Sequence, residues 1–376
     1  MSDDTLTLLK KLLCEASLTP YAANTFQLIE NLLTPLGFTL EYMNAGGVTN
    51  LWATHGSGKP LTCFAGHLDV VPTGPVEEWT SDPFNPTIRD GYLYGRGAAD
   101  MKTSVAAMLV AAQSFVRNHP NHSGTLAFLL TSDEEGPATH GTRHVIETLQ
   151  QRNITIDYCL IGEPTSEHRL GDTIKHGRRG SLTGKLKIYG TQGHIAYPHL
   201  ADNPIHRFTP ALQELTHTIW DTGDDFFQPT QWQISNIHAG TGAANVIPGV
   251  MDITFNFRHA PISSAENLKT RFTAILDCYQ LKYDIVWGKS YPFLSERGPF
   301  TDHVIAAVQT ITGIKPKLST HGGTSDGRFI SWICKHILEL GPVNESMHKI
   351  NECVRLDDIE PLRGIYELIL ESVINN

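Results

Sequence analysis

The feature that most restricts the fold of this chain is a set of short apolar segments that end directly in histidine or carboxylate residues. Segment 61–65 leads into His67, 126–130 leads into an acidic triplet, and 158–161 leads into Glu163. Short apolar segments that alternate with helical patterns predict a sheet covered by helices on both faces. Loops at the strand ends of such a sheet commonly build the functional site, so these polar residues become the first candidates.

The middle third of the chain has a different pattern of elements. It is predicted to contain a strand at 182–189, a helix at 204–220, strands at 232–237 and 251–258, a helix at 265–279 and a strand at 283–287. This βαββαβ order is that of a ferredoxin-like unit. We therefore expect an α/β fold in which a mixed sheet domain, 1–178 and 293–376, is interrupted by a smaller domain at 179–292.

Composition excludes several classes of protein. The chain has 29 Lys and Arg against 39 Asp and Glu, a net charge of −10, so no nucleic-acid or anionic-membrane partner is expected. Its longest mostly apolar run, 105–116, is shorter than the roughly 20 residues that span a bilayer. The N-terminus lacks the pattern of a signal peptide, and six cysteines lie far apart without a CxxC pair. These features predict a cytoplasmic protein with reduced thiols.

Two motifs contain candidate residues for a metal site. His67 and Asp69 are two residues apart, so on an extended segment their side chains point the same way, and Asp69 could orient the imidazole. An isolated pair of this kind is more often a surface histidine beside a solvated carboxylate. Asp100 follows a glycine-rich turn and precedes a predicted helix, where it could bind a metal or simply cap the helix.

Three further signals complete the set of candidates. Glu134 and Glu135 are adjacent, so their side chains diverge, and one could bind metal while the other moves protons. Alone, this acidic run, Glu163 and His348 could each be ordinary polar loop residues. Together, two histidines and three carboxylates without a thiolate suit a hydrolytic zinc site with open positions. Two ions would need a bridging carboxylate, for which Asp100 is the candidate.

The motifs GHLDVVP (66–72), YGRGAADMK (94–102), SDEEG (132–136) and IGEP (161–164), followed by a late histidine, resemble the dinuclear zinc aminopeptidase and deacylase family. This family includes carboxypeptidase G2 and acetylornithine deacetylase. The resemblance implies a zinc-aminopeptidase-like catalytic domain with an inserted lid domain that often dimerises. It also implies two zinc ions per subunit, with cobalt as a substitute.

The resemblance assigns roles to residues of this chain. One zinc ion is expected on His67, Asp100 and Glu163, and the other on Asp100, Glu135 and His348. Glu134 is expected to take a proton from the attacking water and to return it to the leaving amine, while Asp69 orients His67. His194 matches a lid histidine that reaches the site of the partner subunit in a homodimer, although it could also be a residue without function.

Four segments, 177–207, 236–249, 322–330 and 341–354, resemble the desuccinylase branch of this family. The implied reaction is hydrolysis of the dicarboxylate amide N-succinyl-LL-2,6-diaminopimelate to succinate and LL-2,6-diaminopimelate. Residues expected to contact this substrate are Arg178, Arg258, Asn245, Thr324, Asn344 and Tyr197. The two arginines suit carboxylates because a guanidinium pairs with them bidentately, although a strand arginine often makes only a surface ion pair.

Other functions are weighed against the same residues. Acetylornithine deacetylase or another N-acyl-amino-acid hydrolase remains the alternative enzyme, although the segments 177–207 and 322–354 favour the desuccinylase. A non-catalytic metal-binding relative is disfavoured because Glu134 is retained beside Glu135. Family-typical chains often have a second asparagine where this chain has Ala244, and Asn245 is the matching residue. A nicotinamide-dependent enzyme lacks support, since no complete glycine-rich turn follows a strand.

Overall fold

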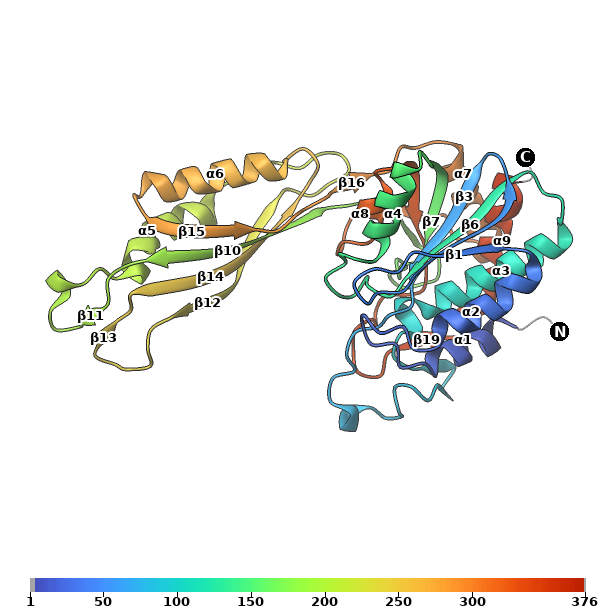
Figure 1. The fold of residues 1–376 in the computed structure, drawn as a ribbon, viewed down its shortest axis with the longest axis horizontal. Helices are drawn as coiled ribbons and strands as arrows, with labels where there is room; N and C mark the ends of the chain where they lie inside the picture. Colours follow the sequence, from blue (N-terminus) through green and yellow to red (C-terminus); the bar gives the residue numbers. More distant parts are fainter. Residues whose placement is uncertain (1–3, 375–376) are drawn as a thin grey trace. The chain divides into compact units, whose positions relative to one another are not determined.

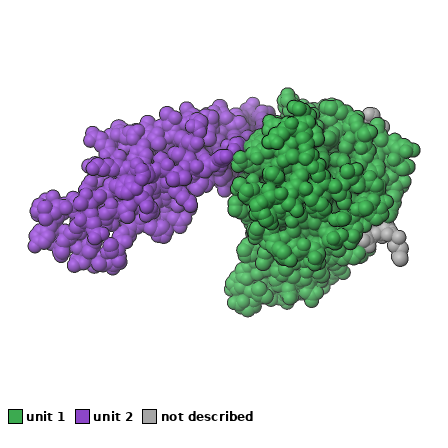
Figure 2. Space-filling model, in the orientation of Figure 1, with its two compact units in different colours: residues 1–177, 295–319, 325–376 green, residues 178–294, 320–324 purple. Residues whose placement is uncertain are grey.

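The computed structural model describes residues 4–374 and divides into two compact units (Figure 2). Unit 1 consists of the chain up to Gly177, Ser295–Ser319 and the chain from Ser325 onward, and unit 2 consists of Arg178–Leu294 and Thr320–Thr324. Each unit has its own apolar core. No helix within residues 4–374 is long and apolar enough to cross a membrane.

Unit 1 is built on an eight-stranded mixed sheet (Figure 1). In spatial order its strands are β1 (Thr39–Tyr42), β2 (Asn50–Ser57), β6 (Gly124–Thr131), β3 (Leu61–His67), β7 (Ile156–Ile161), β18 (Cys334–Glu339), β8 (Thr173–Lys175) and β17 (Lys317–Ser319). Strands β6, β3, β7 and β18 run parallel to one another. All eight residues of β6 are buried, as expected for a continuous apolar segment inside a covered sheet.

Helices cover this sheet and complete the core of unit 1. They are α1 (Thr5–Leu13), α2 (Thr25–Leu33), α3 (Thr103–Asn118), α4 (Thr142–Gln151), α7 (Pro299–Thr312), α8 (Gly327–Ile330) and α9 (Leu356–Ile374). Short helical turns are η1 (Thr34–Leu36), η2 (Val76–Glu78) and η3 (Ala98–Lys102), and β4 (Thr87–Arg89), β5 (Tyr92–Tyr94) and β19 (Cys353–Arg355) form a small sheet. Helix α3 packs against α1, α2 and α9, and its small residues are almost all buried (Figure 1).

Unit 2 has the βαββαβ order that the sequence predicts. Its elements are β10 (Gly180–Tyr189), α5 (Pro204–His217), β12 (Gln231–Ala239), β14 (Val250–His259), α6 (Ala265–Cys278) and β15 (Lys282–Trp287). The antiparallel sheet has the order β12-β14-β10-β15 (Figure 1). Alternate residues of β10 are buried, so one face of the sheet packs into the core with α5 and α6 while the other stays open.

Short elements connect these parts. They are β9 (Gly177–Arg178) and β16 (Phe293–Leu294) where the chain enters and leaves unit 2, and β11 (Gly193–His194), η4 (Pro198–Leu200) and β13 (Val246–Ile247) within it. Some bounds differ from the sequence predictions. Helix α5 ends at His217, and Trp220 is buried from the loop that follows.

A further difference concerns the domain bounds. Arg178, Phe293–Leu294 and Thr320–Thr324 belong to unit 2, although the sequence predicts them in the larger domain. The Nη1 atom of Arg178 donates hydrogen bonds of 3.4 Å to the carbonyl oxygens of His321 and Gly323, which link the segment Thr320–Thr324 to unit 2. The hydroxyl of Thr320 also donates to the carbonyl oxygen of Phe226.

Candidate metal centre and active site

The candidate site lies where three parallel strands of unit 1 end. His67 is the last residue of β3, while Glu135 follows β6 and Glu163 follows β7. Because parallel neighbours end at the same edge of a sheet, these three side chains converge. Asp100 joins them from η3, just before α3 begins, and His348 joins them from the loop before β19.

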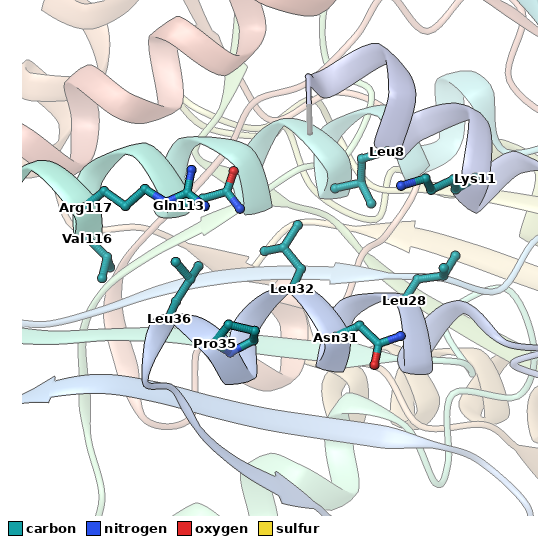
Figure 3. Close-up of a pocket in the computed structure, with 10 residues that line it drawn as sticks. All are labelled: Leu8, Lys11, Leu28, Asn31, Leu32, Pro35, Leu36, Gln113, Val116 and Arg117. Atoms are coloured by element: carbon teal, nitrogen blue, oxygen red, sulfur yellow. The ribbon is translucent and has the colours of Figure 1, made fainter. Parts of the chain in front are cut away.

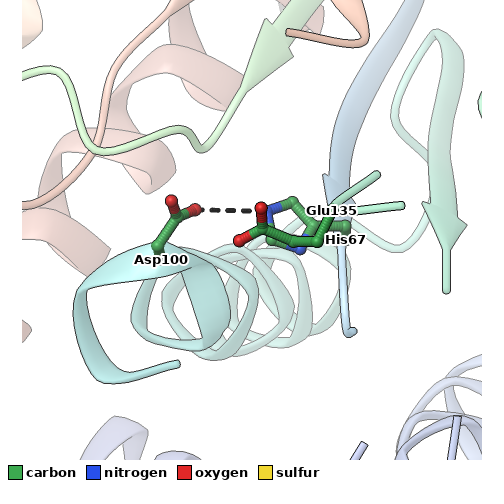
Figure 4. A group of neighbouring side chains, drawn as sticks. All are labelled: His67, Asp100 and Glu135. Atoms are coloured by element: carbon green, nitrogen blue, oxygen red, sulfur yellow. Dashed lines mark hydrogen bonds and ion pairs between the residues drawn. The ribbon is translucent and has the colours of Figure 1, made fainter. Parts of the chain in front are cut away.

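Asp100 lies between the two histidines. Its Oδ1 atom is 3.1 Å from Nε2 of His67, and its Oδ2 atom is 3.3 Å from Nε2 of His348. The second imidazole is also 2.9 Å from Oε1 of Glu135 (Figure 4 shows His67, Asp100 and Glu135). On the other side, Oε1 of Glu163 is 3.9 Å from Nε2 of His67. One carboxylate oxygen toward each histidine is the arrangement that a bridging ligand requires.

The donor set fits divalent cations. Ligand atoms of His67, Asp100 and Glu135 lie within 4.8 Å of one another, and so do those of His67, Glu134 and Glu163. All the donors are imidazole nitrogens or carboxylate oxygens, which suits zinc or a harder divalent ion. Burial raises the pKa of Glu163 well above its usual value, and the nearby carboxylates of Asp100 and Glu134 raise it further. Acids crowded in one buried place either stay protonated or pair with cations, so a bound divalent cation would favour their ionised forms.

Without a metal, the protons on His67 and His348 compensate part of the negative charge of the carboxylates. Although burial opposes ionisation of Asp100, hydrogen bonds from His348 and His67 hold its pKa below the usual range. Hydrogen bonds to Asp100 and Glu135 raise the pKa of His348 to about 10. The two imidazoles and the acids therefore attract each other strongly, and a bound metal would replace these contacts.

Asp69 acts differently from the sequence prediction in one respect. The Nδ1 atom of His67 lies 2.9 Å from the backbone carbonyl oxygen of Asp69, whereas the Asp69 carboxylate is 3.7 Å away. That carboxylate accepts hydrogen bonds from the backbone N–H groups of Glu134 (3.3 Å) and Glu135 (3.1 Å). The contact of Asp69 with His67 is therefore made by its backbone oxygen, while its side chain holds the acidic loop.

Two glycines at the strand ends leave room for the side chain of Met101. A Cβ atom on Gly66 would lie 2.4 Å from Cε of Met101, and one on Gly162 would lie 2.7 Å from the same atom. These glycines immediately precede His67 and Glu163, and Met101 immediately follows Asp100. The buried Met101 side chain therefore packs between two ligand-bearing strand ends. Met101 was not singled out in the sequence analysis. The available signal was a glycine immediately before each of two candidate ligands.

Glu134 lies beside two of the candidate ligands. Its backbone is held by Asp69, and ligand atoms of His67 and Glu163 lie nearby. Burial raises the pKa of Glu134 well above its usual value, and the neighbouring carboxylates of Asp326 and Glu135 add to the effect. A carboxylate with a raised pKa can both accept and return a proton near neutral pH.

The other predicted side chains lie mostly in unit 2. Arg178 is buried, and Arg258 lies on β14 opposite Ser181 and Gln231. The Thr324 hydroxyl is buried without a hydrogen-bond partner among the described residues. Asn344 belongs to unit 1, where its backbone N–H donates to the carbonyl oxygen of Ser166.

His194 stands on an exposed part of unit 2 together with two other predicted residues. Its ring centroid is 5.6 Å from that of Tyr197, and the N–H of Ile195 donates to the carbonyl oxygen of Asn245 at 3.0 Å. The N–H of Ala196 donates to Nδ1 of His194 at 3.0 Å. In the neutral ring Nε2 therefore carries the proton and can donate outward.

Peptidase family M20/M25/M40 matches this chain over residues 63–372. The chain belongs to this family. Its curated relatives include the succinyl-diaminopimelate desuccinylases of Nitrosomonas europaea, 55% identical over 375 residues that cover 100% of both chains, and of Methylobacillus flagellatus, 55% identical over 371 residues that cover 98% and 99%.

Solved structures of the M20 family share the fold. An M20 metallo-carboxypeptidase from Sulfolobus solfataricus superposes with a TM-score of 0.84 at 17% identity, covering 98% of this chain and 99% of that one. A dinuclear metal-binding M20 peptidase from Bacillus subtilis superposes with a TM-score of 0.68 at 15% identity, covering 98% and 97%. The predicted α/β fold and the family resemblance are thereby confirmed.

A separate cavity of unit 1 does not have the chemistry of this M20 site. Its volume is about 550 Å³, and it lies between α1, α2, η1 and α3 (Figure 3). The lining residues are Leu8, Lys11, Leu28, Asn31, Leu32, Pro35, Leu36, Gln113, Val116 and Arg117. This lining contains neither histidine nor carboxylate, so it offers none of the ligands found at the edge of the sheet.

Proposed function

We propose that this chain hydrolyses the succinyl amide of N-succinyl-LL-2,6-diaminopimelate to succinate and LL-2,6-diaminopimelate. The observation that carries the proposal is the 55% identity, over the whole chain, to relatives named succinyl-diaminopimelate desuccinylase. The convergence of His67, Asp100 and Glu163 with Glu135 and His348 supports metal-assisted hydrolysis as the reaction class. We place the reaction in the cytoplasm, where the free cysteines would remain reduced.

Two zinc ions are the proposed cofactor, with cobalt as a substitute. His67, Asp100 and Glu163 would hold one ion, and Asp100, Glu135 and His348 would hold the other. When bound, such ions polarise the amide carbonyl and lower the pKa of water to ~7. The crowded, partly buried carboxylates and two imidazoles described above are what support this pair of sites.

Glu134 is the proposed general base and acid. Its carboxylate takes a proton from the attacking water and then delivers that proton to the leaving amine nitrogen, so the proton balance closes over one turnover. Its raised pKa and its fixed backbone favour this role. Positioned acid–base groups contribute about 10²–10⁴-fold to such reactions.

The remaining predicted residues are proposed to bind substrate. Arg178 and Arg258 would pair with its carboxylates, while Thr324 and Asn344 would add hydrogen bonds. The buried Thr324 hydroxyl supports this assignment, because a ligand would supply the partner that the described residues do not provide. Tyr197 and Asn245 would contribute from the surface that carries His194.

His194 is proposed to donate a hydrogen bond from Nε2 to the oxyanion in the active site of a second subunit. A homodimer through unit 2 would provide that arrangement. Support comes from the bond between Ala196 and Nδ1, which leaves the Nε2–H available, and from the exposure of this surface.

The proposal is tested by comparing two substrates on the same zinc-loaded enzyme. We expect succinate release from N-succinyl-LL-2,6-diaminopimelate, with kcat/KM at least ~100-fold above that for N-acetylornithine. The acetyl substrate lacks the succinyl carboxylate, so a protein group that binds this carboxylate would stay unpaired and the transition state would be less stable. Chelation should abolish the activity, and zinc or cobalt should restore it. A preference for N-acetylornithine would instead assign the chain to the deacetylase alternative.

A further inference from the structure

The buried carboxylate of Glu352 lies near the candidate metal centre and has no role assigned above. Glu352 lies four residues beyond His348 and is only 1% exposed. Its Oε1 atom accepts hydrogen bonds from the backbone N–H groups of Ala99 (2.8 Å) and Asp100 (3.0 Å). Its Oε2 atom accepts from the backbone N–H of Gly97 (3.0 Å) and from Nη1 of Arg96 (2.7 Å).

These donors form a ring that matches a carboxylate. Gly97 has a left-handed φ of 86°, and the N–H groups of Gly97, Ala99 and Asp100 converge on the Glu352 carboxylate, much as in anion-binding backbone nests. All four donors are N–H groups, and a carboxylate is purely an acceptor. A glutamine at position 352 has the same size, but its NH₂ group would face two of these N–H donors. The two hydrogen bonds to that oxygen would then be lost.

Arg96 extends the contacts to a third loop. This side chain is 1% exposed, and its Nη1 atom also donates to the carbonyl oxygen of Lys349 at 3.2 Å. Its Nη2 atom donates to the carbonyl oxygen of Pro72 at 3.2 Å. The loops contacted by the Arg96–Glu352 pair are therefore those that follow β3, precede α3 and carry His348.

Stability alone does not account for such a pair. Taking two charges out of water costs several kcal/mol per ion, and apolar replacements of buried pairs are often as stable. A geometric role does account for it. The N–H of Asp100 is bonded directly to Glu352, while Lys349, the neighbour of His348, is bonded to Arg96. The pair thus ties together the backbones of two proposed ligands of one zinc ion.

We infer that Glu352, with Arg96, is a positioning residue that sets the separation of Asp100 and His348 and thereby the affinity of the centre for zinc. This inference rests on the proposed function. Glu352 acts through the backbone and does not bind the metal, because its four acceptor contacts are already made within the protein.

The test is a zinc titration of the metal-free full-length protein with the variant Glu352→Gln. Competition with a chromophoric chelator measures affinity without using catalysis. We expect two zinc ions per wild-type chain and roughly 10–100-fold weaker binding in the variant, the usual effect of removing an outer partner of metal ligands. At saturating zinc the kcat of the variant should return toward the wild-type value, because Glu134 and the substrate contacts are unchanged.

Asp172→Asn is the matched control. The Asp172 carboxylate also accepts three backbone hydrogen bonds within unit 1, from Glu167 (2.8 Å), His168 (2.8 Å) and Arg169 (2.9 Å). None of these donors belongs to the loops of Asp100 or His348. This variant should lower the thermal midpoint while zinc affinity stays at the wild-type value, which separates positioning from general destabilisation.

Arg96→Lys provides a second, milder variant should Glu352→Gln not fold. Lysine retains a charge but lacks the planar fork that reaches Glu352, Lys349 and Pro72 together, so zinc binding should again weaken. If wild type binds two zinc ions and either folded variant binds them equally tightly, the inference is overturned while the proposed function stands. If wild type binds no zinc pair, both are overturned.

Discussion

The backbone N–H of Glu135 donates a 3.1 Å hydrogen bond to the carboxylate of Asp69. The adjacent N–H of Glu134 donates to the same carboxylate, so a single side chain fixes the segment that carries both the proposed base and a proposed ligand. Because Asp69 also receives Nδ1 of His67 on its backbone oxygen, the ends of β3 and β6 are held as one structure.

Replacing Asp69 with asparagine should disturb this loop without emptying the metal centre. The asparagine NH₂ would face a backbone N–H, and one hydrogen bond would be lost. We expect kcat to fall roughly 10–100-fold, the range for partners that orient site residues, with both metals retained. Steady-state kinetics together with elemental analysis measure the two effects, and an unchanged kcat would remove Asp69 from this role.

Glu134 and Glu135 should respond to the same substitution in different ways. Glu134→Gln is expected to keep two metals and to lose at least ~10²-fold in kcat, because it removes the proton acceptor. Glu135→Gln should weaken metal binding, since an amide is a poorer ligand than a carboxylate. Metal analysis of both purified variants distinguishes them, and metal loss in Glu134→Gln would contradict the assignment.

Gly66→Ala should strain the contact with Met101. The new Cβ atom would lie 2.4 Å from Cε, the flexible end of the buried Met101 side chain, so the methionine must shift, at a cost of about 1 kcal/mol in the free energy of unfolding. The double variant with Met101→Ala should recover part of this loss. Gly364→Ala in α9 is the control, because its Cβ would meet only ordinary contacts of 3.5 Å or more.

His259 predicts a pH dependence for unit 2. Burial lowers the pKa of this histidine, which is neutral in the fold, with Nε2 2.8 Å from the Ser290 hydroxyl. At this position the unfolded chain therefore binds more protons below about pH 6.5, and the contribution of His259 to stability falls as the pH decreases through that region. Chemical unfolding at pH 7 and pH 5 should show a larger loss for wild type than for His259→Gln. Equal losses would contradict the prediction.

The proposed role of His194 predicts complementation between inactive variants. His194→Ala should lower kcat about 10²–10³-fold with metal content intact, the effect of losing one oxyanion donor. Mixing it with Glu134→Ala under conditions of subunit exchange would place an intact Glu134 and an intact His194 at one site, so activity should return. Confirmed exchange without recovery would show that His194 does not serve the partner subunit.

The sequence alone predicted the α/β fold and which side chains gather at the candidate site. Apolar segments that end in His67, Glu135 and Glu163 are local patterns, and parallel strands necessarily bring their ends to one edge. The element order of unit 2 could also be predicted, because the alternation of apolar and polar residues and the helical spacing of apolar residues are local properties of the sequence. The end of α5 was not, because Trp220 stays buried after the helix has stopped.

Only the tertiary structure decided how those residues are held. Arg96 and Glu352 are 256 positions apart, and no local pattern indicates that two charged side chains meet in the interior. The use of the Asp69 carboxylate to hold the Glu134–Glu135 backbone likewise depends on the packing of β3 beside β6. Sequence spacing determines which residues reach the edge of the sheet, whereas long-range packing determines their hydrogen-bond partners and hence the geometry of the site.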